Sequence, residues 1–340
     1  MGKRLAYVIA AAALVSLTLL DGQTAAPRIP ASICPLFDRG LTYYRKGDAD
    51  RAIGVFDEVI RLQPTFAEAY IIRGSAYQLK GQLPNALADF DQAIRLDPKS
   101  ARAYCDRADL EHDLFNRPDK ALADYDEAIR LAPNFQRAYY NRGTLFIGRH
   151  NYDGAVADLT RAIQLAPSDL SAYSARAEAY LKKGDRTRAI SDATVTIKLK
   201  PVENRLIRGV HLCLRAKAYE IIGQSELALR DFRQAARVTP NNGSIKNRLA
   251  WFLATRPEDR FRNGREAVLA AKNACELSQW KNSDWMDTLA AAYAEAGEFE
   301  QAVKYEKQAL NDSSLGPRER GEREKRLVLF EQRKPFRENF

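Results

Sequence analysis

The residue types that most often carry chemistry in proteins are few and scattered in this chain. Its three histidines, His112, His150 and His211, lie far apart, and none has a cysteine or carboxylate at metal-ligand spacing. Glu111 precedes His112, but no second histidine follows four residues later, so the helical zinc-protease signature is absent. No G-x-S-x-G motif, phosphate-binding loop or dinucleotide-binding fingerprint occurs. We therefore expect no enzymatic activity, no bound metal and no cofactor.

Four cysteines offer a second possible chemistry, disulfide formation. Cys34, Cys105, Cys213 and Cys275 lie in four well-separated stretches of the sequence. A disulfide needs two Cα atoms within about 7 Å of each other, and the regular spacing described below keeps these residues apart. We expect free and mostly packed thiols, although an exported chain would reach a compartment that permits disulfides.

Arginines and aspartates recur in matched pairs. The pairs, sixteen or seventeen residues apart, are Arg73 with Asp89, Arg107 with Asp124, Arg142 with Asp158, Arg176 with Asp192, and Arg215 with Asp231. Two residues at this separation face each other when they lie on adjacent antiparallel helices, and we predict a ladder of ion pairs that joins such helices. The alternative is an anion-binding stripe of arginines, but the matched aspartates neutralise that charge.

The elements that position these pairs can be read from residues 67–98, AEAYIIRGSAYQLKGQLPNALADFDQAIRLDP. This stretch predicts two amphipathic helices joined by a tight turn at Lys80-Gly81. Gly74 is small enough for two helices to cross closely, and aromatic side chains such as Phe90 fill the space beside the crossing. Pro98 ends the second helix because it has no N–H group to continue the hydrogen-bond ladder.

The same template recurs along most of the chain. The closing prolines are Pro64, Pro98, Pro133, Pro167, Pro201 and Pro240, with spacings of 34, 35, 34, 34 and 39 residues. An alanine lies twelve residues before every one of these prolines. Self-similarity at a near-constant period of this length indicates a repeat architecture, in which each unit buries its apolar face against its neighbours. The extra residues between Val202 and Arg208 are expected in a loop.

This pattern resembles the tetratricopeptide repeat. The resemblance implies an all-α, right-handed superhelical solenoid of antiparallel helix pairs, with the first helices lining a concave groove. We expect six regular repeats over residues 33–240 and two divergent repeats over 241–311, the latter similar to a terminal module of bacterial proteins of this family. A charged C-terminal capping helix and tail over 317–340 would close the array, with the last seven residues frayed.

The concave groove is the expected partner-binding surface, because the resemblance places four positions of each first helix on it. Aromatic side chains with scattered charges suit an extended peptide or a partner helix. The predicted partner-binding residues are Phe37, Tyr44, Ile71, Gln78, Arg102, Asp109, His112, Arg137, Tyr140, Thr144, Ser174, Glu178, Lys217 and Glu220.

One known binding mode of the family does not fit this chain. The chaperone-binding branch clamps a C-terminal carboxylate with lysine, asparagine and arginine side chains. Asn141 stands in one of the clamp positions, but Tyr140, Cys105, Ser171 and Ala175 stand around it. We therefore do not expect a carboxylate clamp.

The N-terminal pattern predicts an export signal. Lys3-Arg4 precedes an apolar run over residues 5–19, and small residues follow, a pattern typical of a secretory signal peptide over residues 1–25 that is cleaved near Ala25 or Ala26. The alternative is an uncleaved inner-membrane anchor, because with Leu20 the run approaches the ~17 residues that a spanning helix needs. We expect an exported protein, periplasmic or secreted, with membrane contact only through this segment if it is retained.

The charge balance and the repeats together leave two hypotheses for the function. The whole chain has a net charge of +9, and an anionic membrane surface or an acidic polymer suits this charge in an exported protein better than nucleic acid, which we do not expect as a partner. The first hypothesis is a non-catalytic protein–protein interaction scaffold of the cell envelope that binds a protein or peptide. The alternative is a structural subunit that self-associates or packs into a larger envelope assembly through its C-terminal helix. A repeat array reports architecture rather than partner, so the partner and the oligomeric state do not follow from it.

Overall fold

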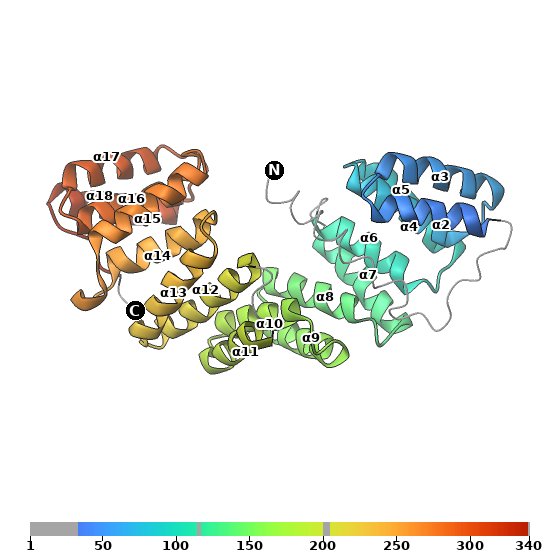
Figure 1. The fold of residues 1–340 in the computed structure, drawn as a ribbon, viewed down its shortest axis with the longest axis horizontal. Coiled ribbons are helices and arrows are strands. Elements are labelled where there is room, and N and C mark those ends of the chain that lie inside the picture. Colours follow the sequence, from blue (N-terminus) through green and yellow to red (C-terminus); the bar gives the residue numbers. More distant parts are fainter. Residues whose placement is uncertain (1–32, 114–116, 200–204, 339–340) are drawn as a thin grey trace. The chain divides into compact units, whose positions relative to one another are not determined.

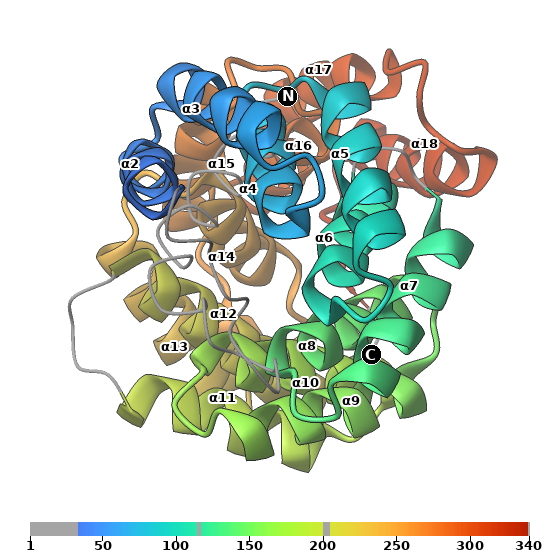
Figure 2. The same cartoon turned by 90° about the vertical axis from the view of Figure 1, so that its right-hand side faces the viewer.

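The structure is a computed structural model that describes residues 33–113, 117–199 and 205–338. The predicted signal segment, residues 1–25, lies outside the described residues. Within these ranges the chain forms seventeen α-helices and one short 3-10 helix, and no strand. Successive helices pair as antiparallel hairpins, and neighbouring hairpins such as α2–α3 and α4–α5 pack side by side (Figures 1 and 2). The prediction of an all-α solenoid of helix pairs is confirmed.

The chain divides into two compact units, Met1–Ala175 and Arg176–Phe340, and each is described by itself. Unit 1 contains four complete hairpins and the start of a fifth. Its helices are α2 (Cys34–Arg45), α3 (Ala49–Leu62), α4 (Ala67–Leu79), α5 (Leu83–Leu96), α6 (Ala101–Asp113), α7 (Pro118–Leu131), α8 (Gln136–Gly148), α9 (Tyr152–Leu165) and the beginning of α10 (Leu170–Lys183).

Unit 2 contains the remaining repeats and the C-terminal helix. Its helices after α10 are α11 (Arg186–Leu199), α12 (Arg205–Ile221), α13 (Ser225–Val238), α14 (Gly243–Thr255), η1 (Asp259–Phe261), α15 (Gly264–Leu277), α16 (Ser283–Glu295), α17 (Phe299–Leu310) and α18 (Pro317–Glu331). The pairs α12–α13, α14–α15 and α16–α17 are called repeats 6, 7 and 8. Helix α18 packs against α17 and α16, in the position of a cap.

The turns inside six of the described hairpins each include a residue in the left-handed region of backbone space. Glycine takes this conformation without strain because it has no Cβ. The glycines are Gly47, Gly81, Gly184, Gly223 and Gly297, with φ between 72° and 89°. In the α8–α9 hairpin His150 takes the role with φ 59°, and its Nδ1 lies 2.8 Å from the Tyr152 hydroxyl. This histidine therefore has a structural explanation.

Small residues permit the close helix crossings that the sequence predicts. A Cβ atom on Gly74 would lie 2.8 Å from the Phe90 ring, and one on Gly143 would lie 2.8 Å from Leu159. Both contacts are too short for any side chain larger than hydrogen. Phe90 and Leu159 are fully buried beneath these glycines, so the large residue of one helix fills the space that the small residue of the other leaves.

The predicted ladder of ion pairs is confirmed in all five repeats. Each arginine donates through Nε and Nη2 to both oxygens of its aspartate, at distances of 2.6 to 3.0 Å. Paired charge-assisted hydrogen bonds of this geometry are strong and directional. The guanidinium groups therefore join the two helices of each repeat, and this argues against a stripe of arginines that binds anions.

Three arginines of the ladder, Arg73, Arg107 and Arg142, also bind an aspartate of the preceding repeat, a contact that sequence reasoning did not foresee. Nη1 of Arg73 donates to Asp57 at 2.7 Å, and Nη1 of Arg107 donates to Asp91 at 2.7 Å. The signal was present in the sequence, because these second aspartates lie two residues after the ladder position. One guanidinium thus joins three helices, and the pKa of Arg107 is raised mainly by its hydrogen bonds to Asp124.

The start of repeat 6 differs from the prediction of a loop. Residues 205–208 form the first turn of α12, which is 17 residues long where the other helices of the array have 12 to 14. The insertion therefore lengthens a helix, and this added turn presents Leu206 with 56% of its surface exposed.

The predicted fraying of the last seven residues is wrong for residues 334–338. Phe336 packs against the core of unit 2, and the Glu338 backbone N–H donates to the Thr255 carbonyl at 2.9 Å. The physical reason is that residues 334–338 find partners on α14, namely the Trp251 ring and the carbonyl groups at the end of that helix. Helix α18 itself buries Phe330 and Arg323 completely or nearly so, as a capping helix must.

A buried carboxyl group beneath α18 makes the stability of unit 2 dependent on pH. Glu306 of α17 is fully buried beside Asp287 of α16, and the nearest guanidinium, on Arg326, lies 3.8 Å away and pairs with Asp287 at 2.7 Å. Burial, reinforced by the Asp287 carboxylate, raises the pKa of Glu306 to about 10. The folded chain therefore keeps this group protonated at neutral pH, whereas the unfolded chain ionises it above about pH 4.5.

We predict that Glu306→Gln raises the unfolding free energy at pH 8 by about 2 kcal/mol and changes it little at pH 4. The sign follows because the folded state binds one proton more than the unfolded state between the two pKa values, so stability falls as pH rises through that window. Urea unfolding at pH 4, 6 and 8 measures the effect. Glu300→Gln, at an exposed position of the same helix, is the control. A gain that is equal at all three pH values would contradict the prediction.

Candidate partner-binding surface

Four of the predicted partner-binding side chains lie inside the units. Phe37, Tyr44, Ile71 and Glu220 have relative exposures of 2%, 7%, 1% and 1%. The Phe37 ring, for example, packs edge-on against the rings of Phe56 and Phe66 at 5.5 and 5.4 Å. A partner therefore cannot reach these four side chains as the chain is folded, and we leave them out of the surface proposed below.

Seven of the predicted residues lie half-buried on three successive first helices of unit 1, which contact one another. We call them the first-helix face of unit 1. They are Gln78 on α4, Arg102, Asp109 and His112 on α6, and Arg137, Tyr140 and Thr144 on α8. Of the three others, Ser174 is half-buried on α10, Lys217 is half-buried on α12, and Glu178 is exposed.

Ion pairs between repeats hold this face together. Arg102 Nη1 lies 2.5 Å from Glu68 Oε1, and Arg102 Nε lies 3.5 Å from Asp106 Oδ2. Arg137 of the next repeat pairs with the other oxygen of Asp106. The charges therefore alternate from α4 through α6 to α8, so each first helix is bonded to the next one along the array.

A second set of hydrogen bonds centres on Asp109. Its Oδ1 accepts from Asn141 Nδ2 at 2.7 Å and from the Tyr125 hydroxyl at 2.6 Å. Arg137 Nε lies 3.4 Å from the sulfur of Cys105. Asn141, the residue that stands in a clamp position, is thus bonded to a carboxylate of its own chain.

The electrostatics of the face follow from burial. Burial raises the pKa of Glu68 and outweighs the opposing effect of Arg102. Burial would lower the pKa of Arg137, but Asp106 and Cys105 outweigh it and raise that pKa. The network contains three carboxyl groups, those of Glu68, Asp106 and Asp109, and two guanidinium groups.

The prediction missed Glu68 and Asp106 of this network, and also Asn141 and Tyr125, which donate to Asp109. A signal existed for Glu68, which stands 34 residues before Arg102 at the same position of the repeat. Opposite charges at equivalent positions of neighbouring repeats indicate an ion pair between first helices. No comparable signal marks Asp106, because its partner Arg137 is four positions earlier in the next repeat's helix.

The histidines and cysteines are the side chains that could react or bind a metal ion. Burial lowers the pKa of His211 to about 4, so this ring is neutral at physiological pH. All four cysteines are free thiols, and burial raises the pKa of Cys275 to about 12, far from a reactive thiolate. Across residues 33–113, 117–199 and 205–338, no group of histidine, cysteine and carboxylate side chains is arranged to hold a metal ion. Among the helices of these same ranges, none has the length and apolar character to cross a membrane.

Unit 2 has a shallow pocket of about 490 Å³ that the sequence did not reveal. An aromatic stack forms one wall, because the Trp280 ring lies 5.8 Å from the Tyr305 ring, which in turn lies 5.6 Å from that of Tyr293. Trp280 has a φ of 59°, unusual for so bulky a residue. The pocket is lined by Trp280, Met286, Lys304, Tyr305, Gln308 and Asn311.

Comparison with known proteins gives the family. Two sequence models, both described as tetratricopeptide repeat, match residues 37–101, 80–134 and 140–201, and residues 208–314. The chain belongs to the tetratricopeptide repeat family. Proteins of this family typically mediate protein–protein interactions, bind protein or peptide partners and are generally non-catalytic. A search of the curated proteins finds no match to this chain.

Solved structures show the same fold. PilW, described as a widely conserved type IV pilus biogenesis factor, is 20% identical with a TM-score of 0.59, over 65% of this chain and 100% of PilW. The Cut9–Hcn1 hetero-tetramer of APC/C is 15% identical with a TM-score of 0.61, over 85% of this chain and 54% of that one. A tetratricopeptide repeat protein from Parabacteroides merdae is 18% identical with a TM-score of 0.52, over 89% and 100%.

Proposed function

We propose that this tetratricopeptide repeat protein is an exported, non-catalytic scaffold of the cell envelope that binds a protein or peptide on the first-helix face of unit 1. The observation that carries the proposal is the row of half-buried side chains on α4, α6 and α8. Ion pairs and hydrogen bonds across successive repeats hold this row in place before any partner arrives. A preorganised surface loses less conformational entropy on binding than a mobile one.

The export part of the proposal rests on the N-terminal sequence alone. A basic start, an apolar run over residues 5–19 and small residues behind it are typical of a signal peptide. Fractionation of cells that express a C-terminally tagged chain, with mass spectrometry of the mature N-terminus, tests this part separately. A mature N-terminus near residue 26 in the periplasmic or secreted fraction supports it, and an intact Met1 in the cytoplasm contradicts it.

Site-specific photo-crosslinking in cells tests the binding surface. A photoreactive phenylalanine analogue in place of Gln78 or Tyr140 is expected to capture one and the same partner. The matched controls carry the analogue in place of Arg95 on α5 or Arg130 on α7, which are exposed on second helices and are expected to capture nothing specific. Capture from the second helices alone would contradict the proposed surface. Crosslinks only to further copies of this chain would favour the self-associating structural subunit instead.

Once the partner is known, Tyr140→Ala should weaken its binding tenfold or more, because a rigid aromatic side chain near the centre of an interface contributes about 2 kcal/mol. Isothermal titration calorimetry with purified partner measures this change. Thr160→Ala, on the second helix of the same repeat, serves as the control and should leave the dissociation constant within about twofold. Equal affinities for the Tyr140 and Thr160 variants would exclude Tyr140 from the interface.

A further inference from the structure

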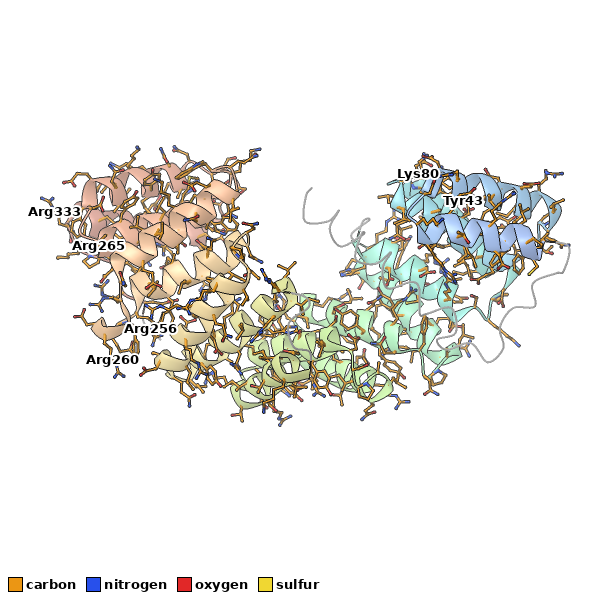
Figure 3. The ribbon with its side chains drawn as sticks, in the orientation of Figure 1. Tyr43, Lys80, Arg256, Arg260, Arg265 and Arg333 are labelled. Carbon is orange, nitrogen blue, oxygen red and sulfur yellow. The ribbon has the colours of Figure 1, made fainter. Side chains whose placement is uncertain are left out.

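The last described residues of the chain lie on the first helices of repeats 7 and 8. Arg333, labelled in Figure 3, follows α18. The backbone turns at this residue, whose φ is 57° and whose N–H donates to the Phe330 carbonyl at 2.9 Å. Residues 335–338 then run along the C-terminal end of α14. We call residues 335–338 the tail segment.

The tail segment covers positions that unit 1 leaves accessible. Counted from Gly243, the first residue of α14, Trp251 and Ala254 occupy the ninth and twelfth positions. Asp109 and His112 occupy the same two positions of α6 on the first-helix face of unit 1. In repeat 7 these two positions contact Phe336, Arg337 and Glu338 of the chain itself.

An aromatic residue forms the first contact. The Phe336 ring lies 5.9 Å from the Trp251 ring, and the Arg326 guanidinium lies 5.7 Å from Trp251 and 5.5 Å from Phe336. Two aromatic rings and a planar cation thus pack together over the half-buried Trp251. Such a contact combines apolar burial with cation–π attraction and selects for an aromatic side chain at this position of a ligand.

The end of α14 forms the second contact. The Glu338 backbone N–H donates to the Thr255 carbonyl at 2.9 Å, and Arg337 Nη1 donates to the Ala254 carbonyl at 3.4 Å. The last carbonyls of a helix have no partner within the helix, and its C-terminus attracts a positive charge. Arg337 Nη2 also pairs with Glu295 at the end of α16, at 2.7 Å. A basic residue is therefore favoured directly after the aromatic one.

A carboxylate forms the third contact. Glu338 Oε2 accepts from the indole N–H of Trp251 at 2.8 Å and from the Thr255 hydroxyl at 3.4 Å. Glu338 also acts electrostatically on the buried Glu220 of α12 and raises its pKa, an effect secondary to that of burial.

We propose that this face of repeats 7 and 8 is a binding site for a short extended peptide in which an aromatic residue is followed by a basic and an acidic residue. The tail segment occupies the site in the same chain until a partner with this chemistry replaces it. All four tail residues are only half-buried, which suits a contact that opens. This inference does not depend on the partner surface proposed for unit 1.

Competition between the tail segment and a free peptide tests the proposal. The probe is a fluorescein-labelled peptide of residues 332–338, titrated into the intact chain and into the same chain ending at Arg333, with fluorescence anisotropy as the readout. We expect the shortened chain to bind the peptide at least tenfold more tightly than the intact chain does. The control peptide carries Phe336→Ala and Glu338→Gln and is expected to bind at least tenfold more weakly to the shortened chain.

A full-length variant and a spectroscopic readout keep the test decisive if the shortened chain does not fold. The intact chain with Phe336→Ala and Glu338→Gln retains its length and should bind the unmodified peptide more tightly than the natural chain does. The Trp251 indole N–H resonance, one of three indole signals, should move in this variant and return towards its natural position when peptide is added. Equal binding to all chains, or none, would overturn the proposal. A dimer of the intact chain that disappears when the tail is removed would overturn its intramolecular part.

Discussion

Replacing Asp231 by alanine is expected to lower the free energy of unfolding of unit 2 by about 3–5 kcal/mol. Asp231 is fully buried, and both of its oxygens accept from Arg215, at 2.6 and 3.0 Å. Removing the carboxylate leaves a guanidinium with 13% of its side chain exposed and without its main counter-ion. The loss of stability is large because the Arg215 guanidinium is buried away from water and would no longer have the Asp231 carboxylate to compensate for its lost hydration. Urea unfolding followed by circular dichroism measures it.

Two further variants separate the effect of burying the Arg–Asp ion pair from the effect of changing a side chain at this position of the repeat. Arg39 and Glu58 form the nearest counterpart in the first repeat, 3.8 Å apart with about half of each side chain exposed, so Glu58→Ala should cost less than about 1 kcal/mol. The double variant Arg215→Met with Asp231→Leu should recover most of what Asp231→Ala loses, because it leaves no unpaired charge. If Asp231→Ala cost no more than Glu58→Ala, the ladder would not be the stabilising element that its geometry indicates.

The second large effect is expected from Gly264→Ala, which should destabilise unit 2 by about 2–3 kcal/mol. Gly264 is the first residue of α15, and a Cβ atom there would lie 2.5 Å from the backbone nitrogen of Ala296 and 2.8 Å from the carbonyl carbon of Glu295. Backbone atoms at the end of α16 cannot rotate away as a side chain can. The two helices must therefore separate. Thermal and urea unfolding measure the loss.

The same substitution at Gly321 in α18 is the matched control and is expected to act in the opposite direction. Nothing lies within 4 Å of a Cβ atom at that position, and alanine is favoured over glycine inside a helix by up to about 1 kcal/mol. Gly264→Ala should also loosen the tail segment, since Glu295 binds Arg337 at the displaced end of α16. Stabilisation by both substitutions would show that α15 and α16 tolerate the added methyl group.

Much of the fold follows from local pattern, because each repeat is built from contacts within about forty residues. The period of the prolines, the small residues at the crossings and the arginine–aspartate pairs are all local features, and the structure confirms the helix pairs and the ladder. Arg73 and Asp89 are an example, since the length of two helices and a turn alone brings them face to face. Glu68 and Arg102 follow the same logic one repeat further on.

The candidate site is less predictable from local pattern. The position of a residue in the repeat predicts the direction in which its side chain points from its own helix. It does not predict whether a neighbouring helix covers that side chain. Ile71 leaves α4 in the predicted direction, yet the helices after it bury it against Ala93 and Ala103. Tyr140, near the corresponding position of α8 in the second half of unit 1, stays half-buried. The packing of adjacent repeats makes this difference.

By itself, the sequence determined the repeat, the helix pairs and the ion-pair ladder of this protein, because these depend on residues close together in the chain. Only the tertiary structure decided that residues 335–338 pack against α14. Their charge and polarity favour a frayed end, but Trp251 and the carbonyls at the end of α14, more than eighty residues earlier in the chain, give them partners. Contacts at such a distance leave no periodic mark in the sequence. They depend on where α18 returns the chain, and that is settled by packing in three dimensions.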